Sequence, residues 1–148
     1  MFLRKNKRIK KKKYPYTTRA VPVYKGQLIH TSRRTSERRF FLKPDKFTRQ
    51  VCEYCLGAAA EKHEILVHAY VFMSNHYHLL ITDTLGRYPA FLADLNRNIA
   101  KCMNVKLGRK ENFWNSSDPG IVRIAEDMET IEETFKYLVP IPKMDVIV

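Results

Sequence analysis

The sequence lacks several features that would place the protein in a membrane or in an oxidising compartment. No apolar run approaches the ~18 residues that a membrane-spanning helix needs. The amino terminus turns basic after Met1-Phe2-Leu3, without the apolar core and cleavage site of a secretory signal. Three cysteines give no even-numbered disulfide framework. We therefore expect a cytoplasmic protein without a membrane role. Its 148 residues, 45% of them hydrophobic, are enough for one domain with a proper core.

Acidic side chains are missing from the first 36 residues. All 15 Asp and Glu residues follow this segment, whereas 12 of the 27 Lys and Arg residues lie within it, eight of them between Arg4 and Lys13. Such a density keeps a segment solvated and attracts polyanions. We expect a basic, disordered tail at residues 1–19 and a single domain at residues 20–148. The tail is either a solubilising extension or, as we favour, a nucleic-acid-binding segment through Lys10, Lys11, Lys12 and Lys13.

A second C-x-x-C motif is also missing, so Cys52 and Cys55 do not complete a zinc quartet. The pair falls inside a helical pattern, with Val51, Cys55 and Ala58 on one apolar stripe. We therefore predict that both cysteines are small core-facing side chains. Cys102 lies on the apolar stripe of a later helix, and we predict a core position for it as well.

Hydrophobic periodicity predicts seven elements. Strands are expected at residues 27–35, 65–73, 76–82 and 121–124, and helices at 46–63, 90–107 and 128–138. Asp45 is a suitable N-cap for the first helix. The order strand, helix, hairpin, helix, strand, helix is typical of an antiparallel α+β domain. We expect the hairpin of residues 65–82 to form the centre of its sheet.

Two histidines in this hairpin are the clearest candidates for chemistry. His76 and His78 lie in the run MSNHYHLLI at residues 73–81. Alternate residues of a strand face the same side, so the two imidazoles converge. Two neutral imidazoles form a partial metal site, with room for a carboxylate, an amide, water or a substrate phosphate. The alternative is a pair of hydrogen-bonded sheet histidines without a ligand.

The segment from His68 to Leu80, HAYVFMSNHYHLL, resembles the signature of the HUH single-strand DNA transposases, which include the insertion-sequence and REP-associated tyrosine transposases. The likeness extends from about Gly26 to Tyr137. It implies a ferredoxin-like antiparallel sheet, with the histidine pair on a central strand and helices on one face. It also implies that His76 and His78 hold a catalytic Mg²⁺ or Mn²⁺. After Tyr137 the chain departs from the family pattern, so we expect a truncated or diverged carboxyl end.

In the resembling family, a tyrosine on the long helix after the histidine strand attacks a DNA phosphodiester while the metal polarises the phosphate. Residues 90–113 contain no tyrosine. Three interpretations stay open: an inactive descendant that binds DNA, a different nucleophile, or a tyrosine from elsewhere, with Tyr88 and Tyr137 as weak candidates. By its position Tyr137 is better explained as a packing residue. Asn104 is either a third metal ligand or a helix cap.

Basic and aromatic residues suggest where nucleic acid binds, because unpaired bases stack on aromatic rings beside positive charge. Trp114 is either a stacking platform or a core anchor. Our leading hypothesis is a transposase-like protein that binds single-stranded or hairpin DNA, with transesterification by the usual route not expected. An inactive DNA- or RNA-binding regulator is the alternative, and the resemblance allows a monomer or a homodimer. The candidate basic contacts in the folded part are Arg33, Arg34, Arg38, Arg39, Arg97, Lys101, Arg109 and Lys110.

Overall fold

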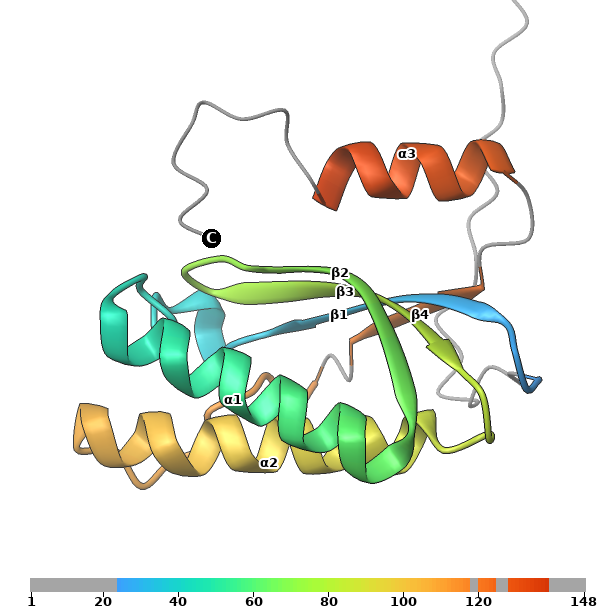
Figure 1. Cartoon of the computed structure of the whole chain (residues 1–148). Coiled ribbons are helices and arrows are strands. Elements are labelled where there is room, and N and C mark those ends of the chain that lie inside the picture. Colours follow the sequence, from blue (N-terminus) through green and yellow to red (C-terminus); the bar gives the residue numbers. More distant parts are fainter. Residues whose placement is uncertain (1–23, 118–119, 125–127, 139–148) are drawn as a thin grey trace, which may run out of the picture.

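The computed structural model describes residues 24–117, 120–124 and 128–138. The expected tail, with Lys10, Lys11, Lys12 and Lys13, and the expected divergence after Tyr137 lie outside the described residues. No helix in the described part is long and apolar enough to cross a membrane. The chain alternates strands and helices (Figure 1) in the order β1 (Leu28–Arg34), η1 (Ser36–Arg38), α1 (Lys46–His63), β2 (Ile65–Phe72), β3 (His76–Asp83), α2 (Tyr88–Leu107), β4 (Ile121–Ile124) and α3 (Met128–Leu138).

The four strands form one antiparallel sheet in the order β2-β3-β1-β4. The α+β class and the central position of the histidine strand are therefore confirmed. The prediction that both hairpin strands are central is wrong for β2, which lies at an edge. The reason is that β1 pairs with β3 along its whole length, from Leu28 opposite Thr82 to Arg34 opposite His76. This pairing leaves β2 with β3 as its partner and its other edge outermost.

Alternate side chains of strand β3 point to the two faces of the sheet, which differ in character. Tyr77, Leu79 and Ile81 are at most 1% exposed and belong to the main core with α1 and α2. His76, His78 and Leu80 alternate with them and therefore lie on the opposite face. We call the side with Tyr77, Leu79 and Ile81 the helical face, and the side with His76, His78 and Leu80 the histidine face.

Helices cover the two faces unequally (Figure 1). Helices α1 and α2 pack together against the helical face, whereas α3 lies across the histidine face and contacts β2 and β3. This arrangement differs from the expected one, in which all helices cover one side. Since α1 and α2 already occupy the helical face, the histidine face is the side left for a third helix.

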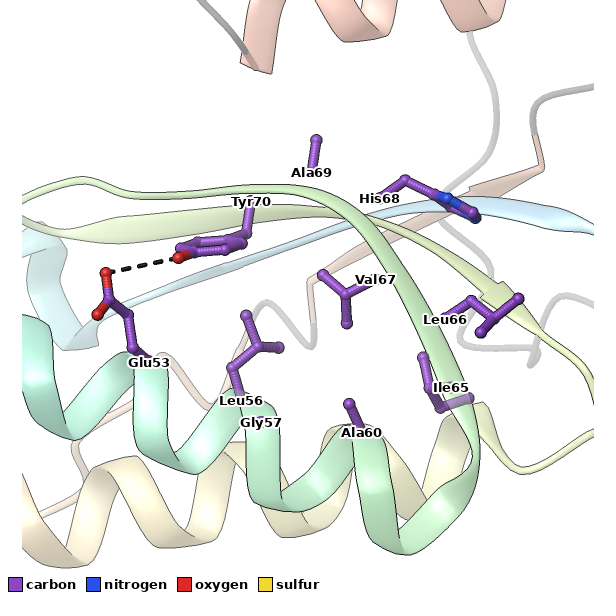
Figure 2. A pocket seen from close by; sticks show the side chains of 10 residues that line it. All are labelled: Glu53, Leu56, Gly57, Ala60, Ile65, Leu66, Val67, His68, Ala69 and Tyr70. Carbon is purple, nitrogen blue, oxygen red and sulfur yellow. Dashed lines mark hydrogen bonds between the residues drawn. The ribbon is translucent and has the colours of Figure 1, made fainter. Parts of the chain in front are cut away.

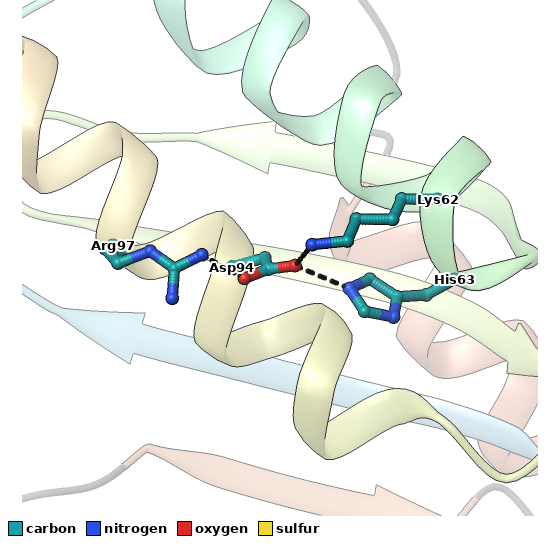
Figure 3. A network of polar contacts seen from close by, with 4 residues as sticks. All are labelled: Lys62, His63, Asp94 and Arg97. Carbon is teal, nitrogen blue, oxygen red and sulfur yellow. Dashed lines mark hydrogen bonds and ion pairs between the residues drawn. The ribbon is translucent and has the colours of Figure 1, made fainter.

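An ionic cluster joins α1 to α2 on the outer side of the helical layer (Figure 3). The carboxylate of Asp94 accepts hydrogen bonds from Lys62 Nζ and His63 Nε2, each at 2.7 Å, and it also forms an ion pair with Arg97. These bonds to Lys62 and His63 hold the pKa of Asp94 well below its usual range. The cluster therefore stabilises the helix pair while Asp94 is ionised.

The outer edge of β2 borders a groove of about 710 Å³ against α1 (Figure 2). A bulge between Val67 and Ala69 shifts the register of β2 against β3. Ala69 therefore turns to the histidine face, whereas Tyr70 lies on the helical side, where its hydroxyl donates to Glu53 at 3.4 Å. The bulge thus changes which residues of β2 face each side.

The cysteine predictions are confirmed for two residues and wrong for the third. Cys52 and Cys55 are buried in α1, and burial raises the pKa of their thiols to about 12 and about 11. Cys102 is exposed. The buried stripe of α2 runs through Leu95, Ile99 and Met103, and it is narrower than the sequence pattern indicated.

Candidate functional site

His76 and His78 lie together on the histidine face, as the alternation predicted. Their ring centroids are 5.0 Å apart and the rings are nearly perpendicular, at 83°. Both side chains are half-buried. Because β3 is a central strand, its backbone is held by a partner on each side, and the two imidazoles project from a rigid support.

Asn75 fixes the orientation of His76. Its amide nitrogen donates to the carbonyl oxygen of Arg38 at 3.1 Å, which identifies the other amide atom as the oxygen. That oxygen lies 2.7 Å from Nδ1 of His76, so Nδ1 must be protonated and donate. The lone pair of His76 is therefore on Nε2. The main-chain oxygen of Asn75 accepts from the buried Thr35, which anchors the β2–β3 turn against the end of β1.

A third histidine lies beside the pair. Nε2 of His30, on β1, is 3.1 Å from Nδ1 of His78. The sequence alone assigns no functional role to His30, because the register of β1 against β3 is not readable from one sequence. The signal available was its place within a predicted strand, on the same side as Leu28.

The electrostatics keep both histidines neutral. Burial, followed by the charges of His30, His76 and Arg34, lowers the pKa of His78 to about 4. Burial and the charge of Arg34 also lower the pKa of His76 below its ordinary value. Metal ions bind the neutral form of imidazole, so both side chains are in the ligand form at pH 7.

The donor set fits a divalent metal ion with several open positions. In the described part of the chain, no group of three or more His, Cys, Asp or Glu residues could hold a metal ion. His76 and His78 supply two nitrogen donors, which suit a transition-metal ion such as Mn²⁺ better than Mg²⁺. The remaining positions would be open to water or to a phosphate oxygen.

Two residues considered for the site lie elsewhere. Asn104 is near the end of α2, on the other side of the sheet, and its amide donates to the carbonyl oxygen of Glu111 at 3.1 Å. It is therefore not placed to join the histidines, and the helix-end role is the one its contacts support. Trp114 is buried, with its indole nitrogen donating to Asn96 at 2.8 Å and its ring against Tyr77. It is a core anchor, since a buried ring offers no face to a base.

The basic candidates are divided between the two faces. Arg34 pairs with His76 across the strands and is exposed, so it lies on the histidine face. Arg38, the last residue of η1, and the following Arg39 are both exposed, and they adjoin the same end of the sheet through the bond from Asn75 to Arg38. The other candidates belong to the helical side: Arg33 alternates with Arg34, Arg97 pairs with Asp94, Lys101 and Lys110 are exposed on or just after α2, and Arg109 stacks on Phe41.

The tyrosine candidates are divided in the same way. Tyr88 begins α2, and its half-buried side chain packs against the core of the helical face. Tyr137 belongs to α3, the helix that lies on the histidine face. In Figure 1 the carboxyl end of α3 points toward the β2–β3 hairpin, the end of the sheet at which β3 begins. The lack of tyrosine in residues 90–113 therefore concerns a helix on the other side of the sheet.

Solved structures of other proteins share the fold of this chain. No protein-family model matches the sequence, and no curated protein matches it. A REP-associated tyrosine transposase solved with a bound REP hairpin superposes with a TM-score of 0.64 at 14% identity, over 82% of this chain and 70% of that one. A proposed transposase from Deinococcus radiodurans R1 gives a TM-score of 0.57 at 19% identity, over 82% of this chain and 95% of that one. The resemblance seen in the sequence is thus confirmed in three dimensions: this chain has the fold of the tyrosine transposases.

Proposed function

We propose that the protein is a transposase-like enzyme that binds single-stranded or hairpin DNA and transesterifies one of its phosphodiesters, with Tyr137 as the nucleophile. The observation that carries this proposal is the position of α3. It is the helix that lies against the face holding His76 and His78, and Tyr137 is its only tyrosine. The fold shared with a hairpin-bound transposase supports DNA as the substrate.

The chemistry requires two groups to meet at one phosphate. The phenol oxygen of Tyr137 loses its proton and forms a bond to phosphorus, the bond from phosphorus to the 3′-oxygen breaks, and the 3′-oxygen takes up a proton. The products are a 5′-phosphotyrosine and a free 3′-hydroxyl. A divalent metal on His76 and His78, when bound, supplies Lewis acidity that offsets charge developing on the phosphoryl oxygens.

Arg34, Arg38 and Arg39 would bind the DNA backbone next to the reacting phosphate. All three are exposed and lie at the end of the sheet where His76 begins β3. Guanidinium groups bind phosphate oxygens through paired hydrogen bonds. Such contacts position a strand but carry no sequence information. The basic tail would add affinity of the same general kind.

The test is a search for a covalent protein–DNA adduct. The protein is incubated with Mn²⁺ and 3′-labelled DNA hairpins that carry randomised single-stranded flanks, and the products are separated on a denaturing gel. We expect labelled protein with the wild type and none with Tyr137→Phe. Tyr88→Phe is the matched control, because Tyr88 packs on the opposite side of the sheet, and it should react like the wild type.

Binding without an adduct would support the alternative function, an inactive regulator derived from a transposase. Gel shifts with the same hairpins measure binding separately from cleavage. Wild-type protein that binds hairpins but gives no adduct with any divalent ion would contradict the catalytic part of the proposal and leave its DNA-binding part in place.

A further inference from the structure

We propose that His30 is a positioning residue for the metal site: it accepts a hydrogen bond from Nδ1 of His78 and thereby sets the tautomer and the ring orientation of that ligand. The inference rests on the proposed metal-binding role of His76 and His78. It adds a residue from a second strand, β1, 48 positions away from His78 in sequence.

The relative orientation of the two rings identifies their contact as a hydrogen bond. Nε2 of His30 and Nδ1 of His78 are 3.1 Å apart, the ring centroids are 5.3 Å apart, and the planes differ by 20°. The centroids are further apart than the nitrogens by about the width of one ring. The rings must therefore lie edge to edge and almost coplanar, with both nitrogens near the line between their centres.

This geometry also argues against His30 as a direct ligand. Two imidazoles that share one metal ion direct both lone pairs toward a common point beside the line between the nitrogens. Here each nitrogen is directed at the other, which is the geometry of an N–H···N hydrogen bond. In the part of the chain that the structure describes there is also no three-donor metal cluster, which agrees with His30 not being a ligand.

The direction of the hydrogen bond follows from the role of His78. A neutral imidazole that coordinates through Nε2 must carry its proton on Nδ1, so His78 donates and His30 accepts. His76 is held in the same way, because its Nδ1 donates to the side-chain oxygen of Asn75 at 2.7 Å. Each ligand thus has one partner at Nδ1, supplied by a different part of the fold. Partners of this kind fix ring orientation and raise the basicity of the ligand.

The test combines metal titration with a measurement of the tautomer. Calorimetry with Mn²⁺ is performed on the full chain as wild type, His30→Phe, His30→Gln and His68→Phe. Nitrogen NMR at pH 7.5 without metal reports the tautomer of His78, whose signals are assigned by their loss in His78→Ala. His68→Phe is the matched control, because the ring of His68 is hydrogen-bonded at 2.8 Å to Thr82, four residues along β3 from His78.

We expect His78 to carry its proton on Nδ1 in the wild type and in His30→Gln, whose amide oxygen also accepts, and to lose this preference in His30→Phe. Mn²⁺ affinity should fall about 10- to 100-fold in His30→Phe, stay within a few-fold of wild type in His30→Gln, and not change in His68→Phe. An unchanged affinity and tautomer in His30→Phe would overturn the inference. Loss of binding in both His30 variants, as complete as in His78→Ala, would make His30 a ligand and also overturn it.

The two measurements separate this inference from the proposed function. A wild-type protein that binds no Mn²⁺ would contradict the metal role itself. The NMR result without metal would still show whether His30 sets the tautomer of His78. The two proposals can therefore be contradicted independently of each other.

Discussion

The two faces of the sheet differ in what they bury. On the helical face, Tyr77, Leu79 and Ile81 are at most 1% exposed and pack with α1 and α2. On the histidine face, His76 and His78 are only half-buried, beside the exposed Arg34. Because alternate residues of one strand serve the two faces, the same eight residues of β3 supply both the core and the site. We infer that stability depends mainly on one face and chemistry mainly on the other.

The largest effect that this comparison predicts comes from neighbouring residues of β3. Leu79→Ala should lower the free energy of unfolding by about 2–5 kcal/mol, because it leaves a cavity in the core. His78→Ala, one position away, should lower it by about 1 kcal/mol, since it removes the hydrogen bond to His30 from a half-buried site. Urea denaturation measures both. If both variants lost the same free energy of unfolding, stability would not depend mainly on the helical face.

A second prediction concerns the strand that closes the sheet. Gly120 precedes β4 with a φ of +95°, and a Cβ there would lie 2.3 Å from the carbonyl oxygen of Ser32. Gly120→Ala should therefore lower the free energy of unfolding by more than about 1 kcal/mol. Gly57→Ala is the control: this helical position has nothing within 4 Å of the added Cβ, and the change should stabilise the protein by about 0.4–1 kcal/mol. Thermal unfolding of the pair should shift in opposite directions.

Two asparagines allow a matched test of the two faces. Asn75 holds His76, and Asn96 accepts from the hydroxyl of the buried Tyr77 at 2.7 Å. Asn75→Ala should weaken Mn²⁺ binding about tenfold, whereas Asn96→Ala should leave Mn²⁺ binding unchanged and lower the free energy of unfolding by about 1 kcal/mol. Calorimetry and urea denaturation of both variants measure these effects. If Asn96→Ala weakened Mn²⁺ binding as strongly as Asn75→Ala, metal binding would not belong to the histidine face alone.

The last prediction concerns pH, because the histidine face and the α1–α2 pair should lose stability in different pH ranges. The pKa of His78 is lowered from 6.5 to about 4, so the unfolded chain binds more protons there, and stability should fall as the pH drops from about 6.5 to about 4. The pKa of Asp94 is lowered from 3.8, so its contribution should be lost only below that pH. His78→Ala should reduce the first change and leave the part that His76 contributes, and Asp94→Asn should reduce the second, in unfolding curves recorded from pH 7.5 to pH 3. A slope between pH 6.5 and pH 4 that is as steep in His78→Ala as in the wild type would assign it to other groups.

Local patterns were sufficient to predict most of the fold. The alternation of residues 76–82 placed His76 and His78 on one face of a central strand, and Asp45 caps α1 as expected, accepting from the main-chain nitrogen of Thr48 at 2.7 Å. These features depend on neighbours in sequence, where propensity and periodicity act. The histidine pair was found for the same reason.

Features that depend on distant pairing could not be predicted. The register of β1 against β3 brings His30 to His78, and no local pattern sets that register. The side of the sheet on which a helix packs is equally hidden in a single sequence. A nucleophile and a ligand, Asn104, were therefore sought on α2, which packs against the helical face. Trp114 and Cys102 illustrate the same limit, because burial in a loop or at the border of a helical stripe depends on what packs there.

The most direct test of the central claim is to map the residue that becomes attached to DNA. The protein is incubated with Mn²⁺ and the DNA hairpins that carry randomised flanks. The DNA is then digested, and the modified peptide is identified by mass spectrometry. We predict a nucleotide on Tyr137, the tyrosine of the helix that lies on the histidine face. A nucleotide on Tyr88, or on any residue of the helical face, would contradict the account, because it would place the chemistry on the side of the sheet that we assign to stability.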